Sequence, residues 1–120
     1  MLHLLITLYS AINGIDPSLS FQMARVESGM NPYAISRTND GGLFQLNRAS
    51  YKFHNEHWRF IPVINIGIAM NTLGKLKNKC THKINNSYVL CYNMGISGAK
   101  KIKKPFSQNY YKKMNLLWRH

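Results

Sequence analysis

The chain has 120 residues, a length that suits one domain and hardly two. Its 16 Lys+Arg against 4 Asp+Glu give a formal charge of +12, which points to a polyanionic partner such as nucleic acid, an anionic membrane or an anionic wall polymer. The 45% hydrophobic content excludes a disordered chain. No apolar run approaches the roughly 20 residues that a membrane-spanning helix needs.

The first twelve residues predict a helix and not a secretory leader. No Lys or Arg precedes Arg25, and the apolar side chains recur at helical spacing: Leu2, Leu5, Ile6, Tyr9 and Ile12. Asn13-Gly14 ends this helix. Asp16-Pro17 begins a second one, because Asp caps free N–H groups and Pro fits the first helical position. Gly29 weakens the end of the second helix and Asn31-Pro32 stops it.

The remaining pattern is mostly helical. We expect, in chain order, a turn-rich stretch at 36–42, a short strand or helix start at 43–46, a loop at 54–59, a helix over 60–77, a buried helix starting at 88–92 and a loop over 93–98. A last helical stripe consists of Phe106, Tyr110, Met114 and Leu117. The sum is a mainly α single domain over residues 1–120, with at most a small β element near residues 34–47.

Carboxylate chemistry must draw on four acidic residues, Asp16, Glu27, Asp40 and Glu56. Glu27 lies one turn after Met23, at the edge of a buried helix face, where partial desolvation favours the protonated form that a general acid needs. Asp40 lies in a polar loop 13 residues on. A pair of carboxyl groups of which one is partly buried and the other lies in a solvated loop is typical of glycosidases. On spacing alone, a solvated Glu and a turn-forming Asp are the commoner interpretations.

The local sequences resemble those of a known family. Residues 24–32 (ARVESGMNP), with the preceding helix start at 14–19, resemble the catalytic-glutamate motif of soluble (SLT-type) lytic transglycosylases. Three later segments are similar to further motifs of the family, in the same order: GLFQLN at 42–47, Asn65-Ile66-Gly67 and Tyr92-Asn93-Met94-Gly95. Phe44 stands where Met is usual, and Cys91 where a small residue is usual. The resemblance covers roughly Leu4 to Ala99.

The resemblance implies a lysozyme-like (α+β) fold and a peptidoglycan lytic transglycosylase, which cleaves the β-1,4 bond between N-acetylmuramic acid and N-acetylglucosamine. Because the muramoyl C6 hydroxyl attacks internally and leaves a 1,6-anhydro sugar, one carboxyl group suffices, and Glu27 takes that role as acid and then base. Tyr92 would orient this carboxyl group. Ser28, Gln45 and Asn93 would line the sugar cleft. No cofactor and no metal are implied.

Two alternatives stay open. Residues 39–47 also resemble the Asp-x-Gly-x-x-Gln-x-Asn segment of c-type lysozymes and of specialised transglycosylases of secretion systems, so Asp40 could serve a hydrolase as the second carboxylate. The second alternative is a non-catalytic basic module that binds wall or nucleic acid through runs such as Lys100–Lys104. His54, Glu56 and His57 lack the order of a zinc-protease motif, so we expect no metal site.

Cys80 and Cys91 are too few for a four-ligand metal site; a disulfide is possible, but two free, partly buried thiols are favoured. We expect a monomer that acts on peptidoglycan glycan strands, without nucleic acid and without membrane insertion. Since no leader is evident, we expect synthesis in the cytoplasm and action on the wall after release or delivery, as for a phage lysis or virion-associated enzyme.

Overall fold

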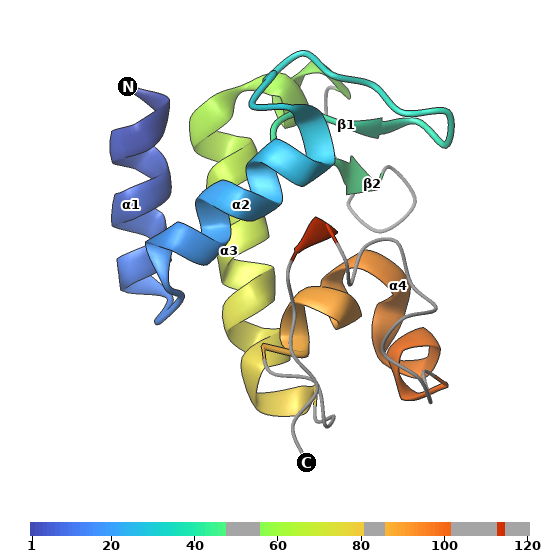
Figure 1. Ribbon diagram of the computed structural model, residues 1–120. Coiled ribbons are helices and arrows are strands. Elements are labelled where there is room, and N and C mark those ends of the chain that lie inside the picture. Colours follow the sequence, from blue (N-terminus) through green and yellow to red (C-terminus); the bar gives the residue numbers. More distant parts are fainter. Residues whose placement is uncertain (48–55, 81–85, 102–112, 115–120) are drawn as a thin grey trace. The chain divides into compact units, whose positions relative to one another are not determined.

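The computed structural model describes residues 1–47, 56–80, 86–101 and 113–114. The chain divides into two compact units, residues 1–71 and 72–120, and each is considered by itself. The described residues contain four α-helices, one 3-10 helix and one two-stranded sheet (Figure 1). The predicted mainly α class with a small β element is therefore confirmed. The expectation of a single domain stays a prediction.

Three helices form the core of the first unit: α1 (Leu2–Ile12), α2 (Pro17–Ser28) and the first part of α3 (Pro62–Lys79) (Figure 1). A buried polar cluster joins them. Ser10 Oγ on α1 donates to Ser20 Oγ on α2 at 2.7 Å, and Ser20 Oγ donates to Met70 Sδ on α3 at 3.3 Å. Because buried hydroxyl groups need partners, this cluster sets the position of the three helices along one another.

Helix α1 confirms the helix predicted for the first twelve residues. It buries Ile6 and Ser10, whereas Leu4, Leu8 and Ile12 keep 66%, 52% and 68% of their surface exposed. This helix therefore packs through one narrow stripe only. Within the described part of the chain, no helix combines the length and the hydropathy needed to cross a membrane.

The β element lies where the sequence predicts it. Strands β1 (Asp40–Gly41) and β2 (Leu46–Asn47) are antiparallel, with Asp40 opposite Asn47 and Gly41 opposite Leu46. An isolated bridge between Ile35 and Gly41 extends the pairing. The apolar run at 43–46 is mainly a turn, and only its last residue belongs to a strand.

The segment before α3 departs from expectation. The predicted loop at 54–59 contains a 3-10 helix, Glu56–Phe60, in its described part. Helix α3 then starts at Pro62 and not at Phe60. Proline has no N–H to donate and its fixed φ suits the first helical position, so Pro62 is the better start.

In the second unit, α4 spans Tyr88–Lys100 and buries Tyr88, Val89, Leu90 and Cys91. The loop predicted over 93–98 is wrong, because helix continues on both sides of a kink at Gly95, whose φ of 80° and ψ of 162° are not helical. Glycine thus breaks the helix here without ending it. Of the last predicted stripe, only Met114 lies among the described residues, and it is buried.

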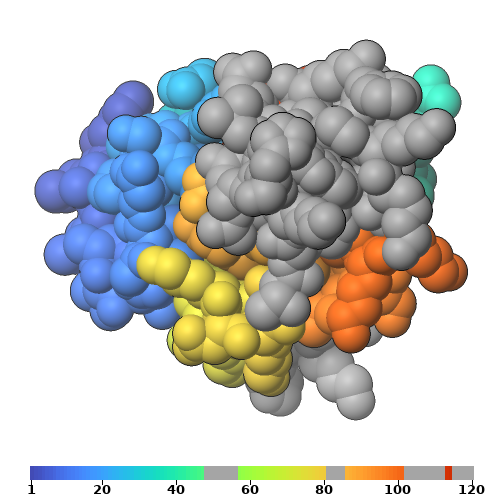
Figure 2. All heavy atoms as spheres, turned by 60° about the horizontal axis from the view of Figure 1, so that its bottom comes forward, coloured from blue at the N-terminus to red at the C-terminus, as the bar shows by residue number. Residues whose placement is uncertain are grey.

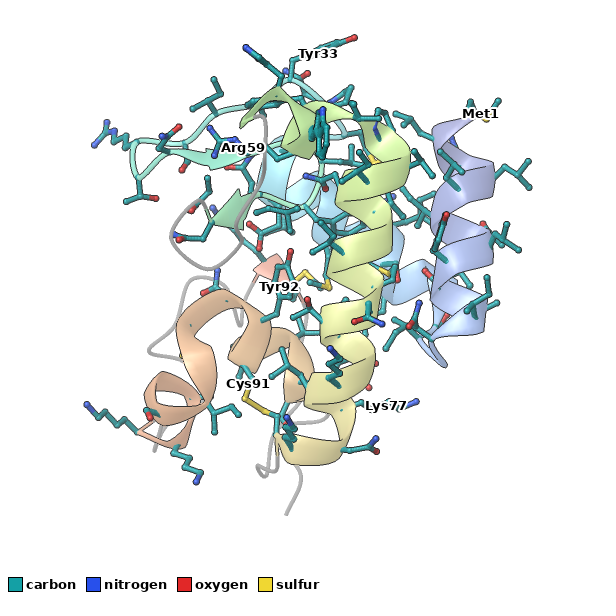
Figure 3. The ribbon with its side chains drawn as sticks, turned by 180° about the vertical axis from the view of Figure 1, so that it is seen from behind. Met1, Tyr33, Arg59, Lys77, Cys91 and Tyr92 are labelled. Carbon is teal, nitrogen blue, oxygen red and sulfur yellow. A yellow bond between two sulfur atoms is a disulfide. The ribbon has the colours of Figure 1, made fainter. Side chains whose placement is uncertain are left out.

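The two cysteines form a disulfide, so the expectation of free thiols is wrong (Figure 3). Cys80 follows the end of α3 and Cys91 lies in the first turn of α4, with their Cα atoms 6.3 Å apart. That separation is within the range a disulfide spans. Ser87, just before α4, donates from its Oγ to the Cys80 carbonyl at 3.3 Å.

We predict that reducing this disulfide destabilises the protein by about 3 kcal/mol, because the bond closes a short loop and restricts the unfolded chain. Urea unfolding with and without dithiothreitol measures the difference. The variant Cys80→Ala/Cys91→Ala serves as the control, since its unfolding should not respond to the reductant. Equal stability of oxidised and reduced wild type would contradict the prediction.

Candidate active site

Glu27 and Ser28 lie in the last turn of α2, a helix with well-defined ends. At its start, Asp16 Oδ1 accepts from Ser18 N–H at 3.0 Å, with Pro17 at the first helical position. At its end, Gly29 adopts a left-handed conformation (φ 64°) and its N–H donates to the Arg25 carbonyl at 2.9 Å. This ending is the usual one for a glycine-terminated helix. The two caps hold the last turn in place.

Glu27 has the partly buried position that its spacing predicts. Its side chain is half-buried and its Oε1 atom is shielded from solvent, while Met23, one turn before, is completely buried. The neighbouring Ser28 is half-buried, and its Oγ donates to the Ala24 carbonyl at 3.0 Å. The Ser28 hydroxyl proton is therefore directed into its own helix.

Asp40 is built into the hairpin. Its Oδ1 accepts from Asn47 Nδ2 and its Oδ2 from Thr38 Oγ1, both at 2.8 Å. Its backbone N–H donates to Ser36 Oγ at 3.0 Å. Both carboxylate oxygens thus bridge parts of the same hairpin, which is a structural function. A catalytic role for Asp40 stays a prediction.

Gln45 ends the turn between the two strands, with a positive φ of 52°. Its amide nitrogen donates to the Gly42 carbonyl at 2.9 Å and to the Ala34 carbonyl at 3.1 Å. An amide NH₂ group has two protons, so both are committed to the backbone. What Gln45 can offer a sugar is therefore its carbonyl oxygen, a hydrogen-bond acceptor.

Asn65, on the first turn of α3, connects this hairpin to the rest of the first unit. Its Oδ1 accepts from Phe44 N–H at 2.9 Å, and its Nδ2 donates to the Gly41 carbonyl at 3.0 Å and to the Arg59 carbonyl at 2.8 Å. The side chain is 1% exposed. The sequence pointed to this residue as part of a motif but not to its role. The sequence feature that could have indicated this role is a single amide side chain within a strongly apolar segment.

The contact between Asn65 and the hairpin requires glycine at position 42. Its φ is +83°, and a Cβ atom there would lie 2.3 Å from Asn65 Nδ2 and 2.6 Å from the Arg59 carbonyl oxygen. No real side chain tolerates such distances. The glycine therefore permits the close approach of Asn65 to the hairpin.

Arg59 is a second residue that sequence reasoning missed. It is 4% exposed, and its guanidinium donates to the backbone carbonyl and to the side-chain Oδ1 of Asn39, the residue before Asp40. It also lies over the Phe60 ring, 4.9 Å from the centroid. The only sequence feature that could have indicated its burial is that Arg59 stands between two aromatic residues. Figure 3 shows Arg59 beside the hairpin.

The other predicted site residues lie in the second unit, on α4. Tyr92 is half-buried (Figure 3) and Asn93 is exposed. The expected contact of Tyr92 with Glu27 stays a prediction. His54, of the rejected metal set, lies outside the described residues, among which no group of three or more His, Cys, Asp or Glu side chains could hold a metal ion.

Comparison with known proteins gives two findings. A family model described as the transglycosylase SLT domain matches residues 5–116. A protein of Buchnera aphidicola subsp. Baizongia pistaciae (strain Bp), named membrane-bound lytic murein transglycosylase E, is 33% identical over 119 residues. The alignment covers 88% of this chain and 56% of that protein, so the chain spans little more than half of its relative.

We predict that Gly42→Ala destabilises the protein by about 2–4 kcal/mol, from left-handed strain together with the clash against Asn65. Gly14→Ala is the matched control. Gly14 has a φ of +69° but nothing within 4 Å of the added Cβ, so only the strain of about 1–2 kcal/mol applies. Thermal or urea unfolding compares the two variants. Equal losses would show that the Asn65 contact has no such requirement.

Proposed function

The chain belongs to the transglycosylase SLT domain family, and on that premise we propose that it is a peptidoglycan lytic transglycosylase. Its reaction cleaves the β-1,4 bond between N-acetylmuramic acid and N-acetylglucosamine and leaves a 1,6-anhydromuramoyl end. The observation that supports this proposal most directly is Glu27, which is half-buried at the capped end of α2 and lies in the segment 24–32 that resembles the catalytic-glutamate motif of the family.

The proposed mechanism needs one carboxyl group that works twice. Protonated Glu27 donates its proton to the glycosidic oxygen as the bond from muramoyl C1 to that oxygen breaks. The Glu27 carboxylate then takes the proton of the muramoyl C6 hydroxyl, while the oxygen of that hydroxyl forms a bond to C1. The proton balance closes, Glu27 is restored to its acid form, and no water is consumed.

Further polar residues of the family-like motifs would bind substrate in this reaction. The Gln45 carbonyl oxygen is the part of its amide that is not committed to the backbone, so it would accept from a sugar hydroxyl or acetamido N–H. Ser28 and Asn93 would contribute further hydrogen bonds along the glycan. Tyr92 would orient the Glu27 carboxyl group. We further propose that the protein acts as a monomer on the wall, after release or delivery from the cytoplasm.

We predict that Glu27→Gln lowers the rate of peptidoglycan cleavage at least a thousandfold, because Gln has no proton of suitable acidity to donate. Release of soluble muropeptides from purified sacculi measures it. Asp16→Asn is the matched control on the same helix. It also replaces a carboxylate by an amide, and Asn is as good an N-cap as Asp, so activity and stability should be retained.

Wild-type rates in a folded Glu27→Gln variant would overturn the assignment of the acid. Equal losses in both variants would mean that the helix, and not the Glu27 carboxyl group, was damaged. Circular dichroism and the unfolding midpoint establish that each variant is folded.

The hydrolase alternative rests on Asp40, and product chemistry separates it from the proposal. Anhydromuramoyl ends identify a transglycosylase, whereas a hydrolase leaves reducing ends that are one water heavier by mass spectrometry. We predict anhydro products, and similar, moderate losses of activity in Asp40→Asn and Thr38→Val. Both changes disturb the same 2.8 Å hydrogen bond, but only the first removes the carboxylate. A far larger loss in Asp40→Asn, with reducing-end products, would favour the hydrolase.

A further inference from the structure

Positive charge is divided very unequally between the two units. Residues 72–120 contain eleven of the 16 Lys+Arg and none of the four acidic residues, which gives a formal charge of +11. Residues 1–71 contain five basic and four acidic residues, a formal charge of +1. Nearly all of the net charge therefore belongs to the unit that lacks the proposed catalytic acid.

The described lysines of the second unit are on its surface. Six are described, and all are exposed: Lys75, Lys77, Lys79, Lys100, Lys101 and Lys113. Three lie on the last turns of α3 and two at the end of α4, and these helix ends reach the surface in Figure 2, in yellow and orange. Lys77 projects outward from α3 in Figure 3.

The sequence of this unit contains no acidic side chain. Because no Asp or Glu occurs after Glu56, no lysine of residues 72–120 can pair with a carboxylate side chain of that unit. The Cys80–Cys91 disulfide joins the end of α3 to α4 and so holds the lysine-bearing helices together. A constrained surface with a large excess of positive over negative charge attracts polyanions over about a Debye length.

We propose that the lysines at the ends of α3 and α4 bind the free carboxylates of the peptide stems on the glycan strand. This deepens the proposed function, on which it rests, by assigning substrate retention to the second unit. The glycan backbone itself is uncharged, so the stems carry the negative charge that this surface fits. Binding there would keep the enzyme on an insoluble substrate between cleavage events.

The aromatic side chains of this unit favour carboxylate stems over nucleic acid. All six described cations are lysines, which attract carboxylates and phosphates alike as point charges, so charge alone does not separate the two partners. Single-stranded nucleic acid also needs exposed aromatic side chains for stacking. Among the described residues of this unit, Tyr88 is buried and Tyr92 is half-buried, so neither offers an open ring.

The test measures binding without turnover. In the Glu27→Gln background, the lysines at positions 75, 79, 100 and 101 are all changed to Gln, or all to Arg as the charge-preserving control. Cosedimentation with purified sacculi is measured in low and high salt. We expect the Gln set to bind on the order of tenfold more weakly at low salt, with little difference near 1 M salt. The Arg set should bind like its parent.

A chemically altered substrate provides the second arm. Sacculi whose carboxylates have been converted to amides should bind the parent protein and the Gln set equally. Loss of binding in the Gln and Arg sets alike would overturn the proposal, as would weaker binding of the Gln set to amidated sacculi. The proposal would also be overturned if the Gln set bound sacculi as well as its parent does but lost binding to DNA or to anionic vesicles.

Single substitutions then test whether location or net charge matters. Lys79→Gln and Arg37→Gln each remove one exposed positive charge, the first from the second unit and the second from the first. A larger loss for Lys79→Gln supports the proposal, and equal losses contradict it. Fragments released from sacculi by the Glu27→Gln parent would instead refute the catalytic assignment, so the two failures are distinguishable.

Discussion

One buried amide holds the hairpin of the first unit against the start of α3. Asn65 satisfies three backbone groups from two segments, the Phe44 N–H and the carbonyls of Gly41 and Arg59. Without it, these buried groups would lack partners at a cost of about 1–3 kcal/mol each. The turn that presents Gln45 and the strand that presents Asp40 both depend on this anchor. Apolar packing could bury the same surface but could not specify the same register.

Rigidity at the site is concentrated in backbone that is not regular secondary structure. The hairpin has strands of only two residues each, so few ladder bonds support it. Side-chain hydrogen bonds add the support that the short strand pair does not give. Arg59 binds Asn39, and Asp40 connects Thr38 to Asn47. Asn65 binds the Gly41 carbonyl. Such side-chain bonds specify one conformation of a turn more narrowly than a short strand pair does. The hairpin is therefore rigid without being part of a large sheet.

The elements were predictable wherever local chemistry decided them. Asp16-Pro17 marked the start of α2, whereas the helix ends at the weakening Gly29, ahead of the Asn31-Pro32 stop that the sequence indicated. The spacing from Met23 predicted the edge position of Glu27. Prediction failed where distant contacts decide. Nothing near Gly95 indicates that a helix resumes after it, and the spacing of Cys80 and Cys91 does not reveal that two helices bring them together. The burial of Arg59 and the three bonds of Asn65 likewise depend on partners more than five residues away.

Gln45 shows what this arrangement demands of a sequence. Its φ of 52° is a conformation that glycine adopts without strain and that other residues adopt at a cost of roughly 1–2 kcal/mol. Asn39, which precedes Asp40, and Met30, three residues after Glu27, have positive φ as well. Glycine would relieve that strain, but it would also remove the two Gln45 hydrogen bonds to the hairpin backbone and the Asn39 side-chain acceptor of Arg59. A redesign that exchanged Gln45 for glycine would therefore trade backbone strain for two lost hydrogen bonds and the loss of a proposed sugar ligand.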